Sequence, residues 1–369
     1  MLAPNLAATF NLSRTGIGLV TSLVFLGAAV GSGPAGRLTD RTDPARVLGA
    51  AMTVFAGAIA LAALAPDRAV LMLAAVLAGV AYGGVNPPTN VVVAGRLARR
   101  LGFFLSLKQS GVPLGGLLAG VVLPPVALAI GWRSAVGLAA VLCAAVAAAT
   151  PLLRNARTLT VDKDRPGRGA ATRREIVSLA AFGFAMAGTQ WTFLTYLVLF
   201  LTEQLHFHLA QAGLAFALAQ GLGACARLAW GWLSDVSGRR LAVLLVMAAL
   251  QVVTLEVLAG TPNRAFAWPL VALAGFTIVG WNGAYYALLA ETAGPAGLGQ
   301  ASGETLVLIF AGSVVCPPLL GVLVDSLGSW RPLWAVCGGI VAVGATALGV
   351  GFRGPGNPAL IATRGESSL

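Results

Sequence analysis

The sequence predicts an all-α, polytopic membrane protein, and three observations lead to this fold class. Hydrophobic residues make up 57% of the 369 residues and charged residues only 10%, too few charges to cover the surface of a soluble protein of this length. Eleven apolar stretches are long enough to cross a bilayer core of about 30 Å as helices. The alternation of polar and apolar residues over strand-length segments, which is typical of membrane barrels, does not occur in the sequence.

Each predicted span is an apolar run that ends at a polar separator. In the first part of the chain the separators are GRLTDRTDPAR, PDR, RLARR and GWR, and in the second part TEQLHFH, SDVSGRR, TPNR, ETAGPAGLGQASGE and DSLGSWR. Gly, Pro and charged residues in these separators interrupt helices or hold the chain in water. In chain order the spans are Gly16–Ala35, Val47–Ala65, Ala69–Ala94, Phe103–Ile130, Ala135–Leu153, Ile176–Leu201, Ala210–Trp230, Leu241–Gly260, Ala265–Leu289, Thr305–Val324 and Pro332–Gly351.

The placement of Lys and Arg predicts the orientation of the chain. Most of the 24 Lys and Arg residues fall in loops that share a side with the polar segment Arg154–Glu175 and with the C-terminal tail. Because cytoplasmic loops accumulate cations, we expect the C-terminus in the cytoplasm and the protein in a bacterial inner membrane. This placement explains the net charge of +11 without a nucleic-acid partner. We expect a monomer in a lipid bilayer that binds a small-molecule substrate and needs no cofactor.

An internal repeat divides the chain into two related halves. The segment GRLTD at Gly36 matches GWLSD at Gly231, and the same spacing aligns Gly18 with Gly213. Parallel repeats of this kind are typical of transporters built from two bundles around a central path. We therefore expect an N-terminal bundle at 1–153, a cytoplasmic linker at 154–175, a C-terminal six-helix bundle at 176–352 and a cytoplasmic tail at 353–369.

The repeat also predicts a helix whose body precedes the given sequence. The counterpart of Ile176–Leu201 would end within Met1–Leu6, so the opening stretch MLAPNLAATF is interpreted as the end of a first span. Two six-helix bundles bury matching faces, whereas five helices against six expose one face. We therefore expect twelve spans in the full protein, of which eleven are present. A chain that naturally begins with eleven spans is the alternative.

The two repeated loops resemble the signature loop of the major facilitator superfamily. GRLTDRTDPARV and GWLSDVSGRR are similar to the loop that this family places between its second and third helices and again between its eighth and ninth. The resemblance covers the whole chain and implies alternating access, with the loops as conformational gates and their glycines allowing close helix approach. Two departures are Pro44 where a second Gly is usual and Val236 after the Asp. A solvated turn is the alternative role. The positions that match the motif are Gly36, Asp40, Arg41, Arg46, Gly231, Asp235, Arg239 and Arg240.

Two cations inside predicted spans favour an anionic substrate. Arg227 lies eight residues before Asp235, about 12 Å into its helix, and Lys108 lies at a comparable depth. Ionisable groups at this depth usually face a cavity or a partner, and neither Glu256 nor Glu304 is placed to neutralise them. An arginine holds a carboxylate with two parallel hydrogen bonds. We expect both cations to bind a small organic anion such as a monocarboxylate. Structural pairing of Arg227 and snorkelling of Lys108 are the alternatives.

Five polar or aromatic residues complete the predicted substrate site. One Asn pair is matched by the repeat and lies in the family's fourth and tenth helices, which bend during alternating access; Pro87 and Pro88 permit such a bend. The others lie in the seventh and tenth family helices, where they can orient a ligand. Helix–helix contact is the alternative role for each. These candidates are Asn86, Asn282, Gln190, Trp191 and Tyr285.

Competing functions fit the sequence less well. An exporter of hydrophobic or cationic drugs or metabolites would need a buried acid facing the cavity, and the stretch LKQSGVPLGG only partly resembles the antiporter signature because Val112 replaces a Gly. An enzyme is not expected, since HExxH and GxSxG are absent, and a sensor or receptor would carry a longer tail.

His206 and His208 share one outer loop without further ligands, so no metal site is expected. The four cysteines form no CxxC pair and are interpreted as small core residues. Direction of transport and coupling ion stay open, because no midplane carboxylate identifies a proton carrier.

Overall fold

A computed structural model describes residues 2–96, 101–153, 172–260 and 263–353, and these residues form helices and short connections without a strand. Within them, 11 helical segments are long and apolar enough to cross a membrane, which confirms the predicted set of spans. The α-helices are α1 (Ala3–Phe10), α2 (Arg14–Arg41), α3 (Pro44–Leu64), α4 (Arg68–Arg96), α5 (Leu101–Ile130), α6 (Trp132–Ala149), α7 (Arg173–Glu203), α8 (Leu209–Ser237), α9 (Arg240–Ala259), α10 (Ala267–Ala274), α11 (Asn282–Leu327) and α12 (Arg331–Gly351), with the short 3₁₀ helices η2 (Thr150–Leu153) and η3 (Arg264–Phe266) and the π-helix η4 (Gly275–Val279).

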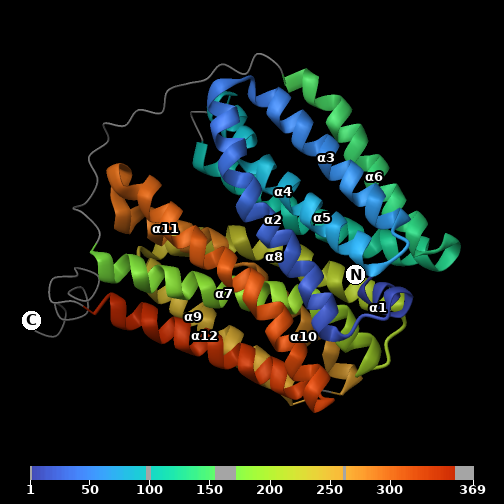
Figure 1. Cartoon of the computed structure of the whole chain (residues 1–369). Coiled ribbons are helices and arrows are strands. Elements are labelled where there is room, and N and C mark those ends of the chain that lie inside the picture. Colours follow the sequence, from blue (N-terminus) through green and yellow to red (C-terminus); the bar gives the residue numbers. More distant parts are fainter. Residues whose placement is uncertain (1, 97–100, 154–171, 261–262, 354–369) are drawn as a thin grey trace, which may run out of the picture.

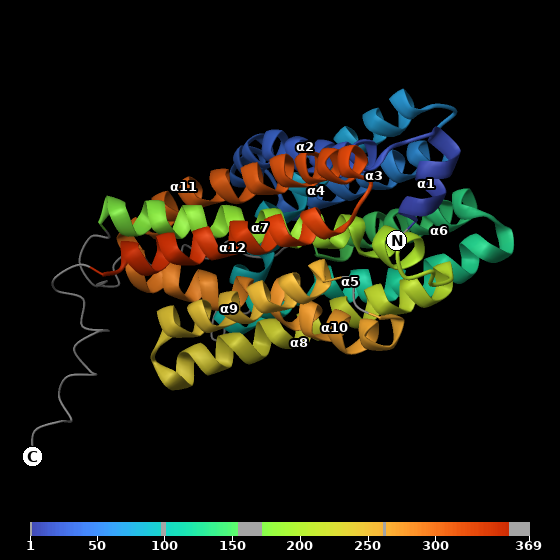
Figure 2. The ribbon, with the colours of Figure 1, turned by 90° about the horizontal axis from the view of Figure 1, so that it is seen from below.

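The helices form two bundles. Helices α2 to α6 make the N-terminal bundle, in which α4 packs against α2 and α3; helices α7 to α12 make the C-terminal bundle, in which α7 packs against α11 and α12. The bundles meet along α2–α11 on one side of the molecule and α5–α8 on the other (Figure 2). In Figure 1 their ribbons converge near α1 and diverge toward the opposite end, where the first half of α11 lies. We call these the converging end and the diverging end.

Contacts of matched glycines show that the sequence repeat is a repeat of structure. A Cβ added to Gly18 on α2 would collide with the backbone of Pro317 on α11. A Cβ added to Gly213 on α8 would collide with the ring of Pro124 on α5. The aligned glycines therefore allow the same close Gly–Pro approach in the two seams between the bundles.

The turn that contains Trp132 and Arg133 and the turn that contains Trp330 and Arg331 have equivalent roles. Arg133 donates hydrogen bonds to the carbonyl oxygens of Ala63 at 2.8 Å and Ala65 at 2.9 Å, at the C-terminus of α3. Arg331 donates to the carbonyl oxygen of Ala259 at 3.1 Å, at the C-terminus of α9. A cation at a helix C-terminus satisfies carbonyls that lack intrahelical partners and complements the helix dipole.

The boundary between linker and bundle differs from the prediction. Residues 154–171 lie outside the described part of the chain, and α7 begins at Arg173, so the last three residues of the range expected for the linker are helical. The reason is a capping box, in which Thr172 Oγ1 accepts from the Glu175 backbone N–H at 3.3 Å and Glu175 Oε2 accepts from the Thr172 N–H at 2.9 Å. The tail after Arg353 also lies outside the described residues. The helix expected to precede the given sequence stays a prediction.

The two spans expected to bend behave differently. The span Arg264–Ala293 is interrupted, because α10 gives way to the π-helix η4 and α11 restarts at Asn282. Insertions of this kind are a common cause of bends. Helix α4, by contrast, runs through Pro87 and Pro88 as one helix.

Candidate functional site

The seam between α5 and α8 brings the two bundles together at three successive levels. Nearest the converging end, a Cβ added to Gly120 would lie 2.8 Å from the carbonyl oxygen of Gly213. At the next level the side chain of Gln220 lies against Gly116. The last level joins Arg227 of α8 to α5. From the converging end onward, the residue numbers of these pairs fall along α5 and rise along α8, so the two helices run antiparallel. Small residues let them approach closely.

Arg227 reaches across this seam from the C-terminal bundle to the N-terminal one. Its Nη1 donates to the carbonyl oxygen of Gln109 on α5 at 2.6 Å, and its Nε donates to the carbonyl oxygen of Val279 at 3.2 Å. The phenols of Tyr82 on α4 and Tyr286 on α11 lie near the guanidinium. Among the side chains that the structure describes, no carboxylate forms an ion pair with Arg227. The cation is therefore held by neutral groups from both bundles.

The second predicted cation, Lys108, lies on α5 next in sequence to the residue that Arg227 contacts. Lys108 precedes Gln109 on α5, and its Nζ donates to Asn86 Oδ1 on α4 at 2.9 Å. Asn86 lies one turn after Tyr82 on α4, so both face the same neighbourhood. The structure thus brings together two predicted site residues, Lys108 and Asn86, and Arg227 contacts α5 at the residue that follows Lys108.

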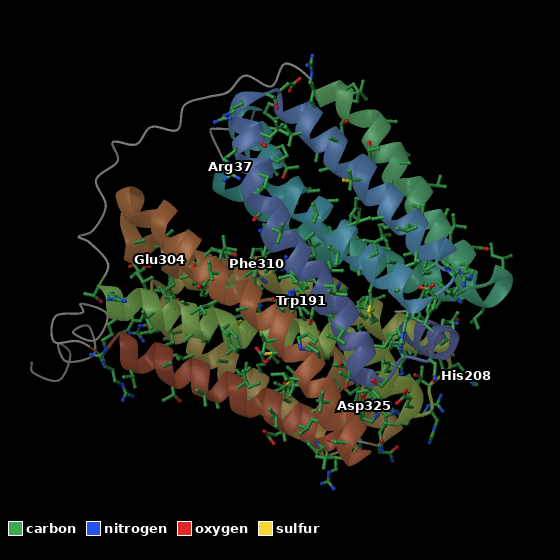
Figure 3. The ribbon with its side chains drawn as sticks, in the orientation of Figure 1. Arg37, Trp191, His208, Glu304, Phe310 and Asp325 are labelled. Carbon is green, nitrogen blue, oxygen red and sulfur yellow. The ribbon has the colours of Figure 1, made fainter. Side chains whose placement is uncertain are left out.

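A cavity of about 410 Å³ lies between the bundles, on the converging side of this cationic group. Its volume falls in the range of about 300–1,000 Å³ that is typical of small-molecule sites. Trp191 of α7, one of the predicted substrate-site residues, lines it, and its ring centroid lies 4.4 Å from that of Phe25 on α2. Figure 3 shows Trp191 and Phe310 near the middle of the molecule, where the two bundles meet. The other lining side chains include Tyr82, Phe216, Gln220, Thr21 and Thr195.

The remaining predicted site residues pack inside the C-terminal bundle. Gln190 Oε1 accepts a hydrogen bond from Trp281 Nε1 at 2.6 Å, and both residues are buried. Tyr285 is fully buried and donates to the carbonyl oxygen of Leu179 at 3.2 Å. Neither Gln190 nor Tyr285 lines the cavity, and their contacts match the helix–helix role that was the alternative. Asn282 is half-buried at the start of α11.

At the converging end, a carboxylate of α11 binds the N-terminus of α2. Asp325 accepts hydrogen bonds from the backbone N–H groups of Arg14 at 3.0 Å and Thr15 at 2.8 Å, and from Thr15 Oγ1 at 2.6 Å. Nearby, Arg14 Nη2 donates to Glu203 Oε2 of α7 at 2.8 Å. Tyr196 donates to the carbonyl oxygen of Arg14 at 2.7 Å. A carboxylate is favourable at a helix N-terminus, so these contacts hold the bundles together at this end.

At the diverging end, the second signature loop forms a charged cluster within its own bundle. Arg240 pairs with Asp235 at 3.1 Å and with Glu291 at 3.2 Å. A Cβ added to Gly36 or Gly231 would meet no atom within 4 Å, so in this conformation no neighbouring helix occupies the Cβ position of either glycine. The other gate candidates are exposed or lie outside the described side chains: Arg41, Arg46 and Arg239 are exposed, and the side chain of Asp40 is not described.

Figure 3 places Arg37 and Glu304 on separate bundles at the diverging end, and His208 and Asp325 at the converging end. The described residues hold no group of three or more His, Cys, Asp or Glu side chains that could bind a metal. Cys316 and Cys337 are buried as expected, whereas Cys225 is exposed, which corrects its interpretation as a core residue.

Several residues of the site were missed by the sequence prediction. Tyr82 and Tyr286 face Arg227, and Gln220 lines the cavity, although Gln220 and Arg227 share one helix face in the sequence. That shared face was the signal that could have identified Gln220. Asp325 and Glu203 lie at span ends, where a carboxylate has no distinctive pattern.

The comparisons with known proteins agree with this architecture. The family model described as Major Facilitator Superfamily matches residues 1–308. A gentisate transporter of Corynebacterium glutamicum is 28% identical over 342 residues, covering 86% of this chain and 75% of the relative. A hexuronate transporter of Bacillus subtilis is 25% identical over 373 residues, covering 94% of this chain and 88% of the relative. Among solved structures, a bacterial homologue of the human lysosomal transporter Spinster, in an inward-facing and occupied conformation, aligns with a TM-score of 0.74 at 16% identity and covers 98% of this chain and 92% of that one. With a family model that spans most of the sequence and a shared two-bundle fold, the chain belongs to the Major Facilitator Superfamily of membrane transporters.

Proposed function

We propose that this transporter moves a small organic anion, such as a monocarboxylate, and that Arg227 binds its carboxylate. The observation that carries the proposal is a guanidinium in the seam between the bundles whose described hydrogen-bond partners are backbone carbonyls, with no carboxylate among its described partners. A carboxylate is a stronger acceptor than a carbonyl and matches the fork of an arginine. Lys108, next to Gln109 on α5, adds a second positive charge.

The position of Arg227 connects anion binding to rocking of the bundles. An arriving carboxylate competes with the Gln109 carbonyl for Arg227 Nη1, and that hydrogen bond joins the bundles. Exchange of this contact for a substrate contact loosens the seam at the level of the site. The transition then closes the diverging end and opens the converging end, where Asp325 releases α2.

The relatives support the chemical class. The two curated relatives are named for gentisate and hexuronate, which are both organic acids. From the distribution of cations we further propose a bacterial inner-membrane protein with a cytoplasmic C-terminus that acts as a monomer. Proton coupling is compatible with this scheme.

Titration of the purified full-length protein tests the proposal. We expect gentisate, glucuronate or lactate to bind and raise the unfolding temperature. Arg227→Gln should weaken this binding by about 10- to 100-fold, because a charge-assisted hydrogen bond contributes about 1.5–3 kcal/mol. Arg227→Lys, which keeps the charge but loses the fork, should fall between the two.

A matched control is Arg264→Gln. Arg264 donates to Gln211 Oε1 at 2.8 Å outside the cavity, so its loss should leave anion binding unchanged. Stabilisation by a cation such as tetraphenylphosphonium, with no response to any carboxylate, would instead favour the exporter of cationic compounds. Equal carboxylate affinity in the wild type and Arg227→Gln would remove Arg227 from the site.

A further inference from the structure

The cavity wall contains a polar group that the anion site does not use. Gln220 of α8 lines the cavity and only 5% of its surface is exposed. Its Oε1 has no hydrogen-bond partner among the described atoms. By contrast, the hydroxyls of Thr21 and Thr195, which also line the cavity, bond to each other at 2.9 Å. A buried amide oxygen without a partner is costly, so an occupant that supplies one is favoured.

The chemistry of the amide indicates which ligand group fits. A glutamine amide carries one acceptor and one donor at neighbouring positions, and it can turn to present either of them. A hydroxyl both donates and accepts, so it satisfies the amide in either orientation. A carboxylate only accepts and would leave the Oε1 atom without a partner.

The rest of the wall indicates the body of the ligand. Rings of Phe25, Tyr82, Trp191 and Phe216 line the cavity, and Phe25 contacts both Trp191 and Tyr82. Aromatic rings prefer stacked or edge-to-face contact with another ring. The cavity volume of about 410 Å³ accommodates a ring with small substituents.

The spacing along α8 relates this group to the cation. Gln220 and Arg227 are two turns apart, about 10.5 Å along the helix axis, and both side chains face α5. Tyr82 joins the two places, because it lines the cavity beside Gln220 and interacts with Arg227. Arg227 is not among the residues that line the cavity, so a ligand held by Arg227 must extend past Tyr82 into the cavity to present its opposite end to Gln220.

We infer that Gln220 is a specificity-determining residue that binds a substrate hydroxyl, and that the substrate is an aromatic carboxylate whose hydroxyl lies across the ring from the carboxylate. This inference rests on the proposed function, because Arg227 fixes the carboxylate end. Gln220 reads the opposite end, and the aromatic wall holds the ring between them.

The test measures affinities of the purified full-length protein for four acids: benzoate, 4-hydroxybenzoate, 2-hydroxybenzoate and cyclohexanecarboxylate. We expect 4-hydroxybenzoate to bind about tenfold more tightly than benzoate, since it satisfies the buried amide. The hydroxyl of 2-hydroxybenzoate lies beside the carboxylate, so this acid should gain nothing, and cyclohexanecarboxylate should bind most weakly. Gln220→Leu, which has a similar size, should abolish the preference for 4-hydroxybenzoate while benzoate still binds. The control Gln211→Leu changes a glutamine outside the cavity and should keep the preference.

The outcomes separate this inference from the function on which it rests. Equal affinity of the wild type for benzoate and 4-hydroxybenzoate overturns the role of Gln220 and leaves the anion site standing. A preference that survives Gln220→Leu overturns it as well. Binding of no carboxylate overturns the proposed function and this inference together. The comparison of benzoate with 4-hydroxybenzoate uses the wild-type protein, so it remains a valid test even if Gln220→Leu does not fold.

Discussion

Replacing Asp325 by Asn should shift the transporter away from the conformation seen here. The carboxylate accepts hydrogen bonds from two backbone N–H groups and one hydroxyl at the start of α2, and about a quarter of its side chain is exposed, at 23%. Asn keeps one acceptor oxygen and loses the negative charge at a helix N-terminus.

The magnitude follows from these contacts. Hydrogen bonds to charged groups contribute about 1.5–3 kcal/mol, and a charge at a helix N-terminus adds about 0.3–1 kcal/mol when partly exposed. Because Asn recovers part of this, we expect Asp325→Asn to cost the converged arrangement about 2–3 kcal/mol. That corresponds to about a 30- to 150-fold shift in the equilibrium between the two conformations.

Distances between spin labels measure this shift. Labels at Leu19 on α2 and Val322 on α11, both on exposed faces, report separation of the converging end in a variant whose native cysteines are replaced. Asp325→Asn should move most of the population to longer distances. The control Glu203→Gln removes only an exposed ion pair, so it should change the populations by at most about fivefold. A folded Asp325→Asn protein with the wild-type distances, or an equal effect of Glu203→Gln, would refute the reasoning.

Three other changes test the seams and the charged cluster. Tyr196→Phe removes the one hydroxyl proton that the carbonyl oxygens of Arg14 and Pro317 share, so we expect a loss of about 1–3 kcal/mol from the converged state, read with the same labels; wild-type distances would contradict this. Gly213→Leu places side-chain atoms where Pro124 of α5 lies, so it should separate the α5–α8 seam and lower the unfolding temperature, whereas an unchanged protein would show that the seam has spare room. Arg240→Gln leaves the carboxylates of Asp235 and Glu291 without their shared cation, so transport should slow while the affinity for the anion stays constant; a loss of affinity without a change in maximal rate would argue against a gate.

The sequence determined the architecture because a bilayer imposes a local rule. Every span needs about 20 apolar residues in a row, so the spans, their separators and the division into two bundles could be read from neighbouring residues. The repeat was equally visible, and its matched glycines, Gly18 and Gly213, occupy equivalent contacts in the two seams. Arg227 and Lys108 were identified because a cation inside a span is unusual in any sequence.

Only the tertiary structure decided which partners these residues have. Arg227 bonds a backbone carbonyl 118 positions away, and Asp325 binds the start of a helix 311 positions away. Every residue carries a carbonyl and every helix has an N-terminus, so no sequence pattern marks the ones that are used. The same holds for Gln220, whose unpartnered oxygen becomes evident only when α5 packs against α8. Local hydropathy fixes where helices lie, and the packing of distant helices fixes which polar groups are left for a substrate.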